Sequence, residues 1–110
     1  MANYATSVLK ISDSYVNTLP FGTCSTGAAT ADKTVDAGTF ALNTGAMVAV
    51  KFTATNTAAN PTLNVSSTGK KSIKTAGAAI GATYLQANRT YIFVYDGTDY
   101  IPLNNTAVWG

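Results

Sequence analysis

The side chains that could carry out acid–base or nucleophilic chemistry are few in this 110-residue chain. Histidine and glutamate are absent, so general acid–base catalysis would fall to aspartate, lysine, tyrosine or the single cysteine. Cys24 has no histidine to activate it as a nucleophile, and we expect it to be a small buried apolar residue. The five aspartates are scattered, at Asp13, Asp32, Asp36, Asp96 and Asp99. The sequence therefore predicts a protein that is not an enzyme.

Metal and cofactor sites find as little support in the sequence. Zinc is bound by clusters of cysteine and histidine, which this chain lacks. The run Asp96-Gly97-Thr98-Asp99 resembles the start of a calcium loop, but the oxygen ligands needed at later positions are missing. No glycine-rich stretch has the spacing of a phosphate-binding loop. We therefore expect no metal and no cofactor.

The only charge cluster is a candidate for surface contacts. Lys70, Lys71 and Lys74 form either a solvated turn or a positive rim that faces an anionic surface, such as teichoic acid or a capsid. The formal net charge of the whole chain is only +2, with an isoelectric point near 8.8. This positive charge is too small and too scattered to predict a nucleic-acid partner.

Three aromatic side chains raise the question of glycan binding, since sugar rings stack on exposed tyrosine or tryptophan. The candidates are Tyr84, Tyr100 and Trp109, of which Trp109 lies beside the C-terminus. Packing in a core or an interface is the alternative role for each ring. Both interpretations stay open at this point.

The composition favours a single, charge-poor β domain. Charged residues make up 11% of the chain, whereas an average soluble domain has about a quarter. Threonine, serine, asparagine and glycine are abundant, and threonine suits a strand better than a helix. The N-terminus lacks the basic and apolar stretches of a signal peptide, and no window approaches about 20 apolar residues. We therefore expect no membrane insertion.

The first 20 residues differ from the remainder. Val8, Leu9 and Ile11 are apolar residues that a 20-residue piece cannot bury alone. The segment is either a short helix or an extended arm. It packs on its own domain, or it docks on a neighbouring subunit or on a larger particle.

From Phe21 onward the pattern is that of short strands separated by glycine turns. The clearest strand covers Ala46–Asn56, where apolar and small or polar residues alternate with a period of two. Shorter strands are predicted at Thr34–Val35, Thr39–Leu42 and Thr62–Val65.

The C-terminal part predicts a β-hairpin. Asp96-Gly97 separates Thr90–Tyr95 from Thr98–Leu103, and we expect a tight turn in which both central residues have positive φ. Pro102 places the last strand at a sheet edge. The first strand is apolar on both faces, with Tyr91, Phe93 and Tyr95 on one side and Ile92 and Val94 on the other. A strand buried on both sides needs two covers, and we expect another subunit to supply the second.

Four segments resemble, in the same order, a β module of tail-fibre and related structural proteins of bacteriophages and prophages. They are Phe21–Thr26, Gly45–Thr53, Thr55–Val65 and Ala87–Thr98. The resemblance covers roughly residues 21–103, and the first 20 residues have no counterpart in it. It implies a repeated β module of trimeric fibres at the particle surface.

We therefore expect an all-β fold: a small antiparallel β-sandwich or jelly-roll-like module over residues 21–110, with an N-terminal docking arm over residues 1–20. The resemblance implies a virion structural protein of the tail-fibre or receptor-binding type. It would work as a homotrimer at the virion surface, with other virion proteins as partners, after assembly in the host cytoplasm and release by lysis. A capsid decoration or head-fibre protein is the first alternative, and a module that binds host-surface glycan is the second.

Overall fold

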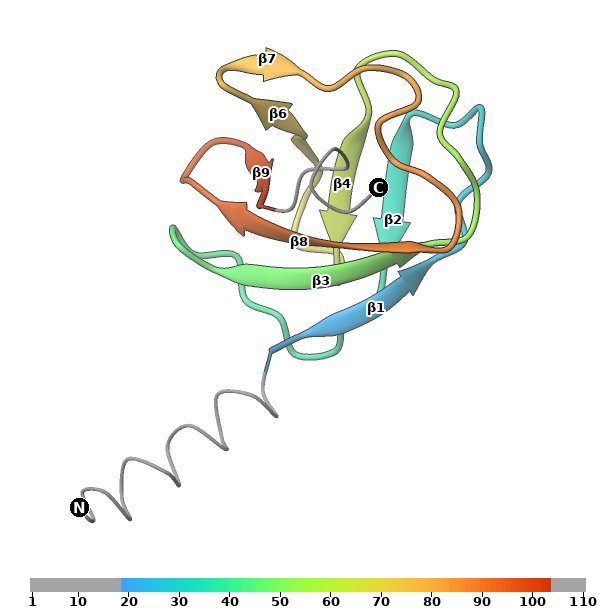
Figure 1. Cartoon of the computed structure of the whole chain (residues 1–110). Coiled ribbons are helices and arrows are strands. Elements are labelled where there is room, and N and C mark those ends of the chain that lie inside the picture. The colour runs from blue at the N-terminus through green and yellow to red at the C-terminus, as the bar shows by residue number, and fades with distance from the viewer. Residues whose placement is uncertain (1–18, 104–110) are drawn as a thin grey trace, which may run out of the picture.

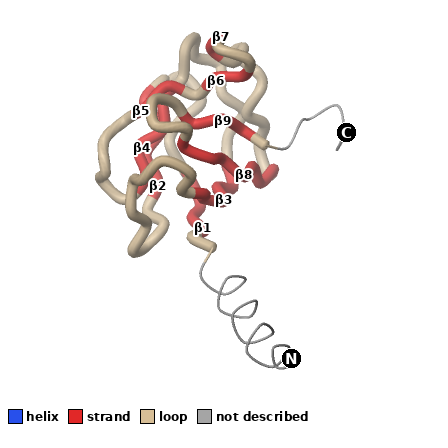
Figure 2. Tube along the Cα trace, turned by 90° about the vertical axis from the view of Figure 1, so that its left-hand side faces the viewer, coloured by secondary structure: helices blue, strands red, loops and turns tan. Residues whose placement is uncertain are grey.

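The computed structural model describes residues 19–103, and this part of the chain is built from strands and loops without a helix (Figures 1 and 2). The nine strands are β1 (Phe21–Cys24), β2 (Asp32–Val35), β3 (Met47–Phe52), β4 (Thr62–Val65), β5 (Lys71–Ser72), β6 (Lys74–Thr75), β7 (Ala78–Ala79), β8 (Arg89–Tyr95) and β9 (Tyr100–Pro102). The all-β prediction is confirmed. Nearly all of the predicted N-terminal arm lies outside the described residues.

The strands form two main sheets that pack face to face. One sheet has the order β1-β3-β8-β9 and the other β2-β4-β5, while β6 and β7 form a separate two-stranded sheet. In Figure 1, β2 and β4 run across the strands of the four-stranded sheet. This arrangement agrees with the predicted β-sandwich.

The pairing is mixed, which corrects the prediction of an antiparallel module. β1 pairs with β3 in parallel, and β2 pairs with β4 in parallel, whereas the other pairs are antiparallel. Parallel neighbours need a long crossover connection. Here the chain alternates between the two sheets, so β2 lies in the crossover from β1 to β3, and β3 lies in the crossover from β2 to β4.

The core lies between the sheets and is lined by alternate residues of the longer strands, β1 to β4, β8 and β9. In β8, Tyr91, Phe93 and Tyr95 point inward and are buried. The Phe93 ring meets Phe52 and Tyr100 edge-on, with ring centroids 6.2 and 6.3 Å apart. Such edge-to-face packing is favourable beyond the area that it buries.

Several predicted strands have other bounds in the structure, and one predicted strand does not form. The predicted strand Ala46–Asn56 is confirmed only over β3, Met47–Phe52. The prediction of a strand at Thr39–Leu42 was wrong, because these residues lie in the connection that carries the chain from one sheet to the other. The apolar signal in this loop comes from Phe40, whose side chain is buried in the core.

The predicted hairpin is confirmed, but its turn differs from the expected type. Gly97 has φ of 103°, whereas Asp96 has no positive φ. The backbone N–H of Asp96 donates to the Asp99 carbonyl, and the Asp96 carboxylate accepts from the N–H groups of Thr98 and Asp99. Asp96 therefore closes the turn through its side chain, and only glycine takes the left-handed conformation.

Candidate assembly surface and polar cleft

The outward side of the four-stranded sheet carries two rows of apolar residues. The strand register aligns Phe21, Ala49 and Ile92, and it also aligns Met47, Val94 and Ile101. Leu103 completes the first row, because its N–H donates to the Ile92 carbonyl. The same register, continued by two residues, places Leu19 beside Met47. We call this surface the outer face: Leu19, Phe21, Met47, Ala49, Ile92, Val94, Ile101 and Leu103.

The outer face contains every large apolar side chain that is strongly exposed within residues 19–103. Phe21 is 55% exposed, Leu103 52%, Met47 40% and Leu19 39%. A sheet of a sandwich that faces water normally alternates apolar residues inside with polar residues outside. A contiguous apolar patch is instead typical of a surface that contacts another protein.

Of the residues predicted as interface or core, the three in β8 lie in the core. Tyr91, Phe93 and Tyr95 belong to the core of their own domain, while the alternate residues of β8, Ile92 and Val94, point to the outer face and are half-buried. The face of β8 that needs a second cover is therefore the one with Ile92 and Val94. The predicted arm residues Val8, Leu9 and Ile11 lie outside the described residues.

Within residues 19–103, neither predicted glycan-stacking tyrosine is strongly exposed. Tyr100 is fully buried, so it is not a surface contact, and of its two interpretations the packing role applies. The physical reason is that its ring fills the core between Phe93 and Tyr95, with centroids 6.3 and 5.6 Å away. Tyr84 is half-buried, and the centroid of its ring lies 6.1 Å from that of Tyr91. Trp109 lies outside the described residues.

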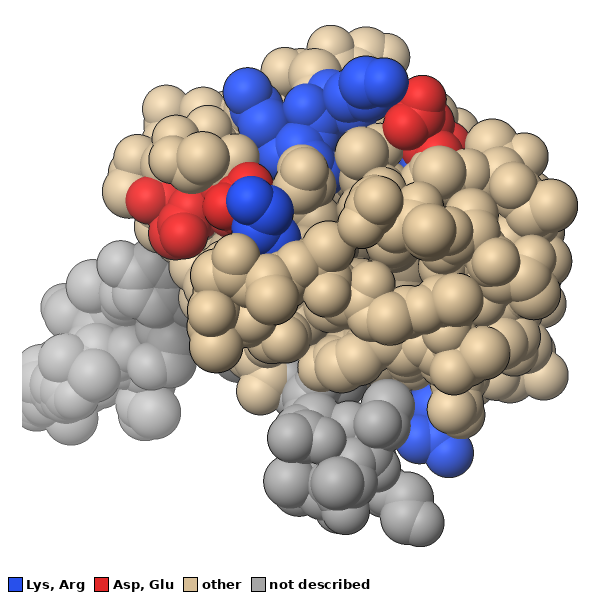
Figure 3. Space-filling model, turned by 90° about the horizontal axis from the view of Figure 1, so that it is seen from above, with Lys and Arg blue, Asp and Glu red and all other residues tan. Residues whose placement is uncertain are grey.

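The lysine cluster lies among carboxylates. Figure 3 shows lysine and arginine side chains on one part of the surface with aspartate beside them, and the rest of this face has few charges. Lys70 forms an ion pair with Asp32 at 3.1 Å, and Lys74 forms one with Asp99 at 3.8 Å. Lys71 is the member of the cluster without an ion pair within residues 19–103. Local compensation of charge weakens the field that a positive rim would present to an anionic surface.

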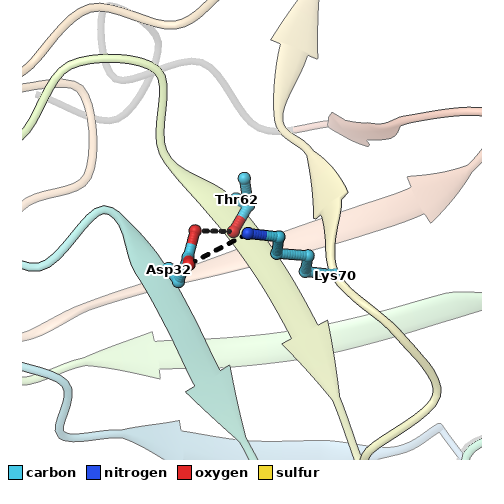
Figure 4. Close-up of polar contacts among 3 residues, drawn as sticks. All are labelled: Asp32, Thr62 and Lys70. Atoms are coloured by element: carbon cyan, nitrogen blue, oxygen red, sulfur yellow. Dashed lines mark hydrogen bonds and ion pairs between the residues drawn. The ribbon is translucent and has the colours of Figure 1, made fainter.

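Asp32 joins two strands of the second sheet to the turn before β5 (Figure 4). Its carboxylate accepts hydrogen bonds from Lys70 Nζ at 3.1 Å and from Thr62 Oγ1 at 2.9 Å. These two hydrogen bonds lower the pKa of Asp32, because they stabilise the charged form. The contacts link β2, β4 and the turn before β5, which is a structural role.

Sequence reasoning missed a buried lysine. Lys33 in β2 is only 1% exposed, and its Nζ donates to the Gly27 carbonyl at 3.1 Å and to the Ala28 carbonyl at 3.4 Å. Burial lowers the pKa of Lys33, because the charged form loses its hydration. The signal was present in the alternation of β2, since Lys33 shares its face with the buried Val35.

A polar cleft of about 560 Å³ opens beside β1 and β2. It is lined by Thr23, Ser25, Thr34, Val35, Asp36, Gly38, Asn64, Ser66 and Ser67. Several of its polar groups already bond to the backbone: the Asp36 carboxylate accepts from Gly38 N–H, and the Ser66 hydroxyl accepts from Ala37 N–H. The turn after β4 holds Ser66 and Ser67 at φ of 49° and 60°, a conformation that non-glycine residues rarely adopt.

The described residues offer no constellation for metal binding or for crossing a bilayer. Residues 19–103 contain no group of three or more histidine, cysteine or acidic side chains that could hold a metal ion. This part of the chain also has no helix that is long and apolar enough to span a membrane. Comparisons of the chain with protein-family models, with curated proteins and with solved structures found no match.

Proposed function

We propose that this protein is a non-enzymatic structural module that assembles with copies of itself through the outer face. The observation that carries the proposal is the collection of all strongly exposed large apolar side chains on one side of one sheet. Burial of such a surface is favourable by roughly 25 cal/mol for each Å² removed from water. Assembly is therefore the function that this geometry supports best.

A second copy of this chain is the binding partner that fits the outer face. The two apolar rows contain no charged residue, and the next aligned row of the sheet adds only Lys51, between Thr23 and Thr90. Two such faces can stack without burying opposed like charges, which would cost free energy. Flat sheets pack in this way, face to face and about 10 Å apart.

The particle to which we assign the module is a bacteriophage virion. Support comes from the resemblance of residues 21–103 to the tail-fibre type of β module, and from the charge-poor, hydroxyl-rich composition. In this proposal the module builds or displays part of the virion surface, at the tail or as a decoration of the capsid. Its partners are further copies of itself and other virion proteins.

The assembly proposal is tested by changing one side chain of the outer face. Val94→Lys places a charge at the centre of the apolar rows and should lower the mass of the assembly in light scattering coupled to size-exclusion chromatography. Ala78→Lys adds the same charge to the separate two-stranded sheet, where Ala78 of β7 is exposed, and serves as the matched control. Equal masses for wild type and Val94→Lys at all concentrations would exclude the outer face as an interface.

The location on the particle is tested by immunogold electron microscopy with an antibody to this chain. Gold at the tail tip would support a fibre or receptor-binding module and direct the next assay to host attachment. Gold spread over the head would support a decoration protein, and capsid stability with and without the chain would then be compared. Virions without any gold would contradict the assignment to a virion.

A further inference from the structure

Most sheet edges in residues 19–103 are protected against pairing with another strand. At β9, the register and the Leu103–Ile92 hydrogen bond direct the nitrogen of Pro102, which has no hydrogen, to the free side. Tyr100 of the same strand forms a bridge to Ile73. At β2, the Thr26 hydroxyl accepts a hydrogen bond from Thr34 N–H at 3.1 Å.

The remaining edge strands are too short to pair stably with a strand of another chain. β5, β6 and β7 have two residues each. β5 also carries Lys71, and a lysine on an edge strand opposes pairing with another chain. Within the described residues, β1 is therefore the one edge strand without such protection.

The open edge of β1 is made by the backbone of Phe21 and Thr23. Ala49 N–H donates to the Pro20 carbonyl at 2.9 Å, and Thr53 N–H donates to the Cys24 carbonyl at 3.1 Å. Backbone groups of alternate residues point to opposite sides of a strand. Since Gly22 and Cys24 share the bonding side with Pro20, the N–H and C=O groups of Phe21 and Thr23 point away from β3.

The open edge is also accessible. Phe21 and Thr23 are exposed, and Thr23 lines the polar cleft, which leaves room beside the strand. The inner side of β1 is occupied instead, since a Cβ on Gly22 would lie 2.6 Å from Val35 Cγ2. An incoming strand therefore has to approach in the plane of the sheet.

We propose that β1 pairs with β1 of a second copy, antiparallel and about a two-fold axis, so that two four-stranded sheets become one sheet. The partner of β1 is identified by its own need for an unprotected edge strand. In a second copy of this chain, the unprotected edge strand is again β1. An isologous contact of this kind needs only one surface patch, used twice.

The register of this contact follows from the open edge. In this register Gly22 lies opposite the partner's Gly22. Phe21 then forms a hydrogen-bonded pair with the partner's Thr23, and Thr23 forms one with the partner's Phe21. Each pair exchanges two N–H···O=C bonds. The central glycines form a non-hydrogen-bonded pair, in which Cα atoms approach to about 4.5 Å. The outer faces of the two copies then lie on the same side of the joined sheet.

The pairing does not depend on stacking through the outer face, and together the two contacts produce a tetramer. Two joined sheets that stack by their outer faces have the symmetry of a dimer of dimers. Thr23→Pro weakens only the edge contact, because the N–H that it deletes points away from β3 and proline is tolerated on edge strands. Val94→Lys removes only the stacking contact.

The experiment measures the mass of the full chain by light scattering and analytical ultracentrifugation. We expect a wild-type tetramer, in contrast to the trimer that the resemblance to tail-fibre modules implies. Thr23→Pro and Val94→Lys should each give dimers, and the double variant should give a monomer. Thr23→Ala keeps the backbone N–H and should behave as wild type. The dissociation constant of the edge dimer, measured in the Val94→Lys background, should rise by roughly tenfold to a hundredfold in Thr23→Pro, since two hydrogen bonds are lost.

Each contrary outcome separates the two contacts. A lower mass for Thr23→Pro but not for Val94→Lys would support edge pairing and refute stacking. An unchanged mass and dissociation constant for Thr23→Pro, or a wild-type trimer, would overturn edge pairing and leave stacking to its own test. If Thr23→Pro fails to fold, hydrogen exchange of the wild-type protein provides the test. The Phe21 and Thr23 amides should exchange slowly in the assembly and rapidly after dilution to the monomer. Equal exchange rates in the assembly and in the monomer would overturn the pairing.

Discussion

Two fully buried tyrosines differ in the bonding of their hydroxyl groups. The Tyr91 hydroxyl donates to the Tyr84 carbonyl at 2.9 Å and accepts from Gln86 N–H at 3.0 Å. The Tyr100 hydroxyl has no hydrogen bond of ordinary geometry within the described residues, although the Thr68 hydroxyl lies close enough to offset part of the effect of burial on its pKa. Burial nevertheless raises the pKa of Tyr100.

This difference predicts that replacing each tyrosine by phenylalanine has a different effect on stability. Tyr91→Phe should lower the free energy of unfolding by about 1–3 kcal/mol, because it removes the hydroxyl that bonds to the part-buried Gln86 N–H and Tyr84 carbonyl. Tyr100→Phe should be neutral or slightly stabilising, because its hydroxyl is desolvated without a compensating bond. Urea denaturation followed by circular dichroism measures both. A larger loss for Tyr100→Phe than for Tyr91→Phe would contradict this assignment.

The carboxylate of Asp96 makes the stability of the hairpin depend on pH. Backbone hydrogen bonds from Asp99 and Thr98 lower the pKa of Asp96 below its ordinary value of 3.8. On acidification the unfolded chain therefore takes up this proton first, so the contribution to stability is fully present above about pH 4 and is lost as pH falls through the folded-state pKa. Asp32 acts in the same direction, because hydrogen bonds from Lys70 and Thr62 lower its pKa.

The melting temperature, measured between pH 2 and 7, should therefore fall at the acid end of this range, where the aspartate carboxylates take up protons. Asp96→Asn should reduce this fall, because the asparagine side chain has no proton to gain. Asp32→Asn combined with Asp96→Asn should show the flattest profile of the series. An equally steep profile in the double variant would show that other groups control acid stability.

At the scale of elements, one glycine permits the two sheets to approach. A Cβ on Gly22 would collide with the backbone carbonyl oxygen of Asp36 and with Val35 Cγ2. Both atoms belong to β2 or to the residue that follows it, so β1 crosses the second sheet at this point. The Val35 side chain is only 6% exposed, so it has little room to move away from an added Cβ.

Gly22→Ala should therefore lower the free energy of unfolding by about 1–3 kcal/mol, as other overpacked sites do. Gly27→Ala is the matched control, because a Cβ on Gly27 would meet nothing within 4 Å and its φ is not positive. We expect this control to be neutral. Thermal or urea denaturation checks both variants, and an equal effect of the two would refute the close approach of β1 and β2.

The two sides of β8 should respond differently to substitution. Phe93 is fully buried among aromatic rings, so Phe93→Ala should cost about 3–5 kcal/mol of stability through loss of burial and formation of a cavity. Val94 faces outward, and Val94→Ala should leave the stability of the monomer within about 1 kcal/mol. Chemical denaturation in dilute solution measures both. A small effect of Phe93→Ala would contradict the core assignment.

At the scale of the whole molecule, assembly links stability to concentration. If the folded chains associate and the unfolded chains do not, the apparent stability increases with protein concentration. The melting temperature of the wild type should therefore rise over a hundredfold range of concentration, and that of the Val94→Lys, Thr23→Pro double variant should stay constant. A wild-type melting temperature independent of concentration would argue against any self-association in that range.

The sequence by itself determined the fold class and most strands. Alternation with a period of two identified β3 and β4, because a strand that packs one face on a core needs apolar residues at every second position. The hairpin followed from Asp96-Gly97, and the edge position of β9 followed from Pro102, because turns and edges depend on local backbone chemistry. The two-sided apolar pattern of β8 indicated a surface in need of a second cover.

Only the tertiary structure decided which residues share that surface. Leu19, Phe21, Met47 and Leu103 are far apart in the chain, and strand register alone places them with Ile92 and Val94 on the outer face. Tertiary packing also buried Lys33 and Tyr100, and paired β1 with β3 in parallel. Local patterns report which side of a strand is apolar. The neighbour that each strand meets depends on how the chain crosses between sheets, and a periodic pattern carries no information about that crossing.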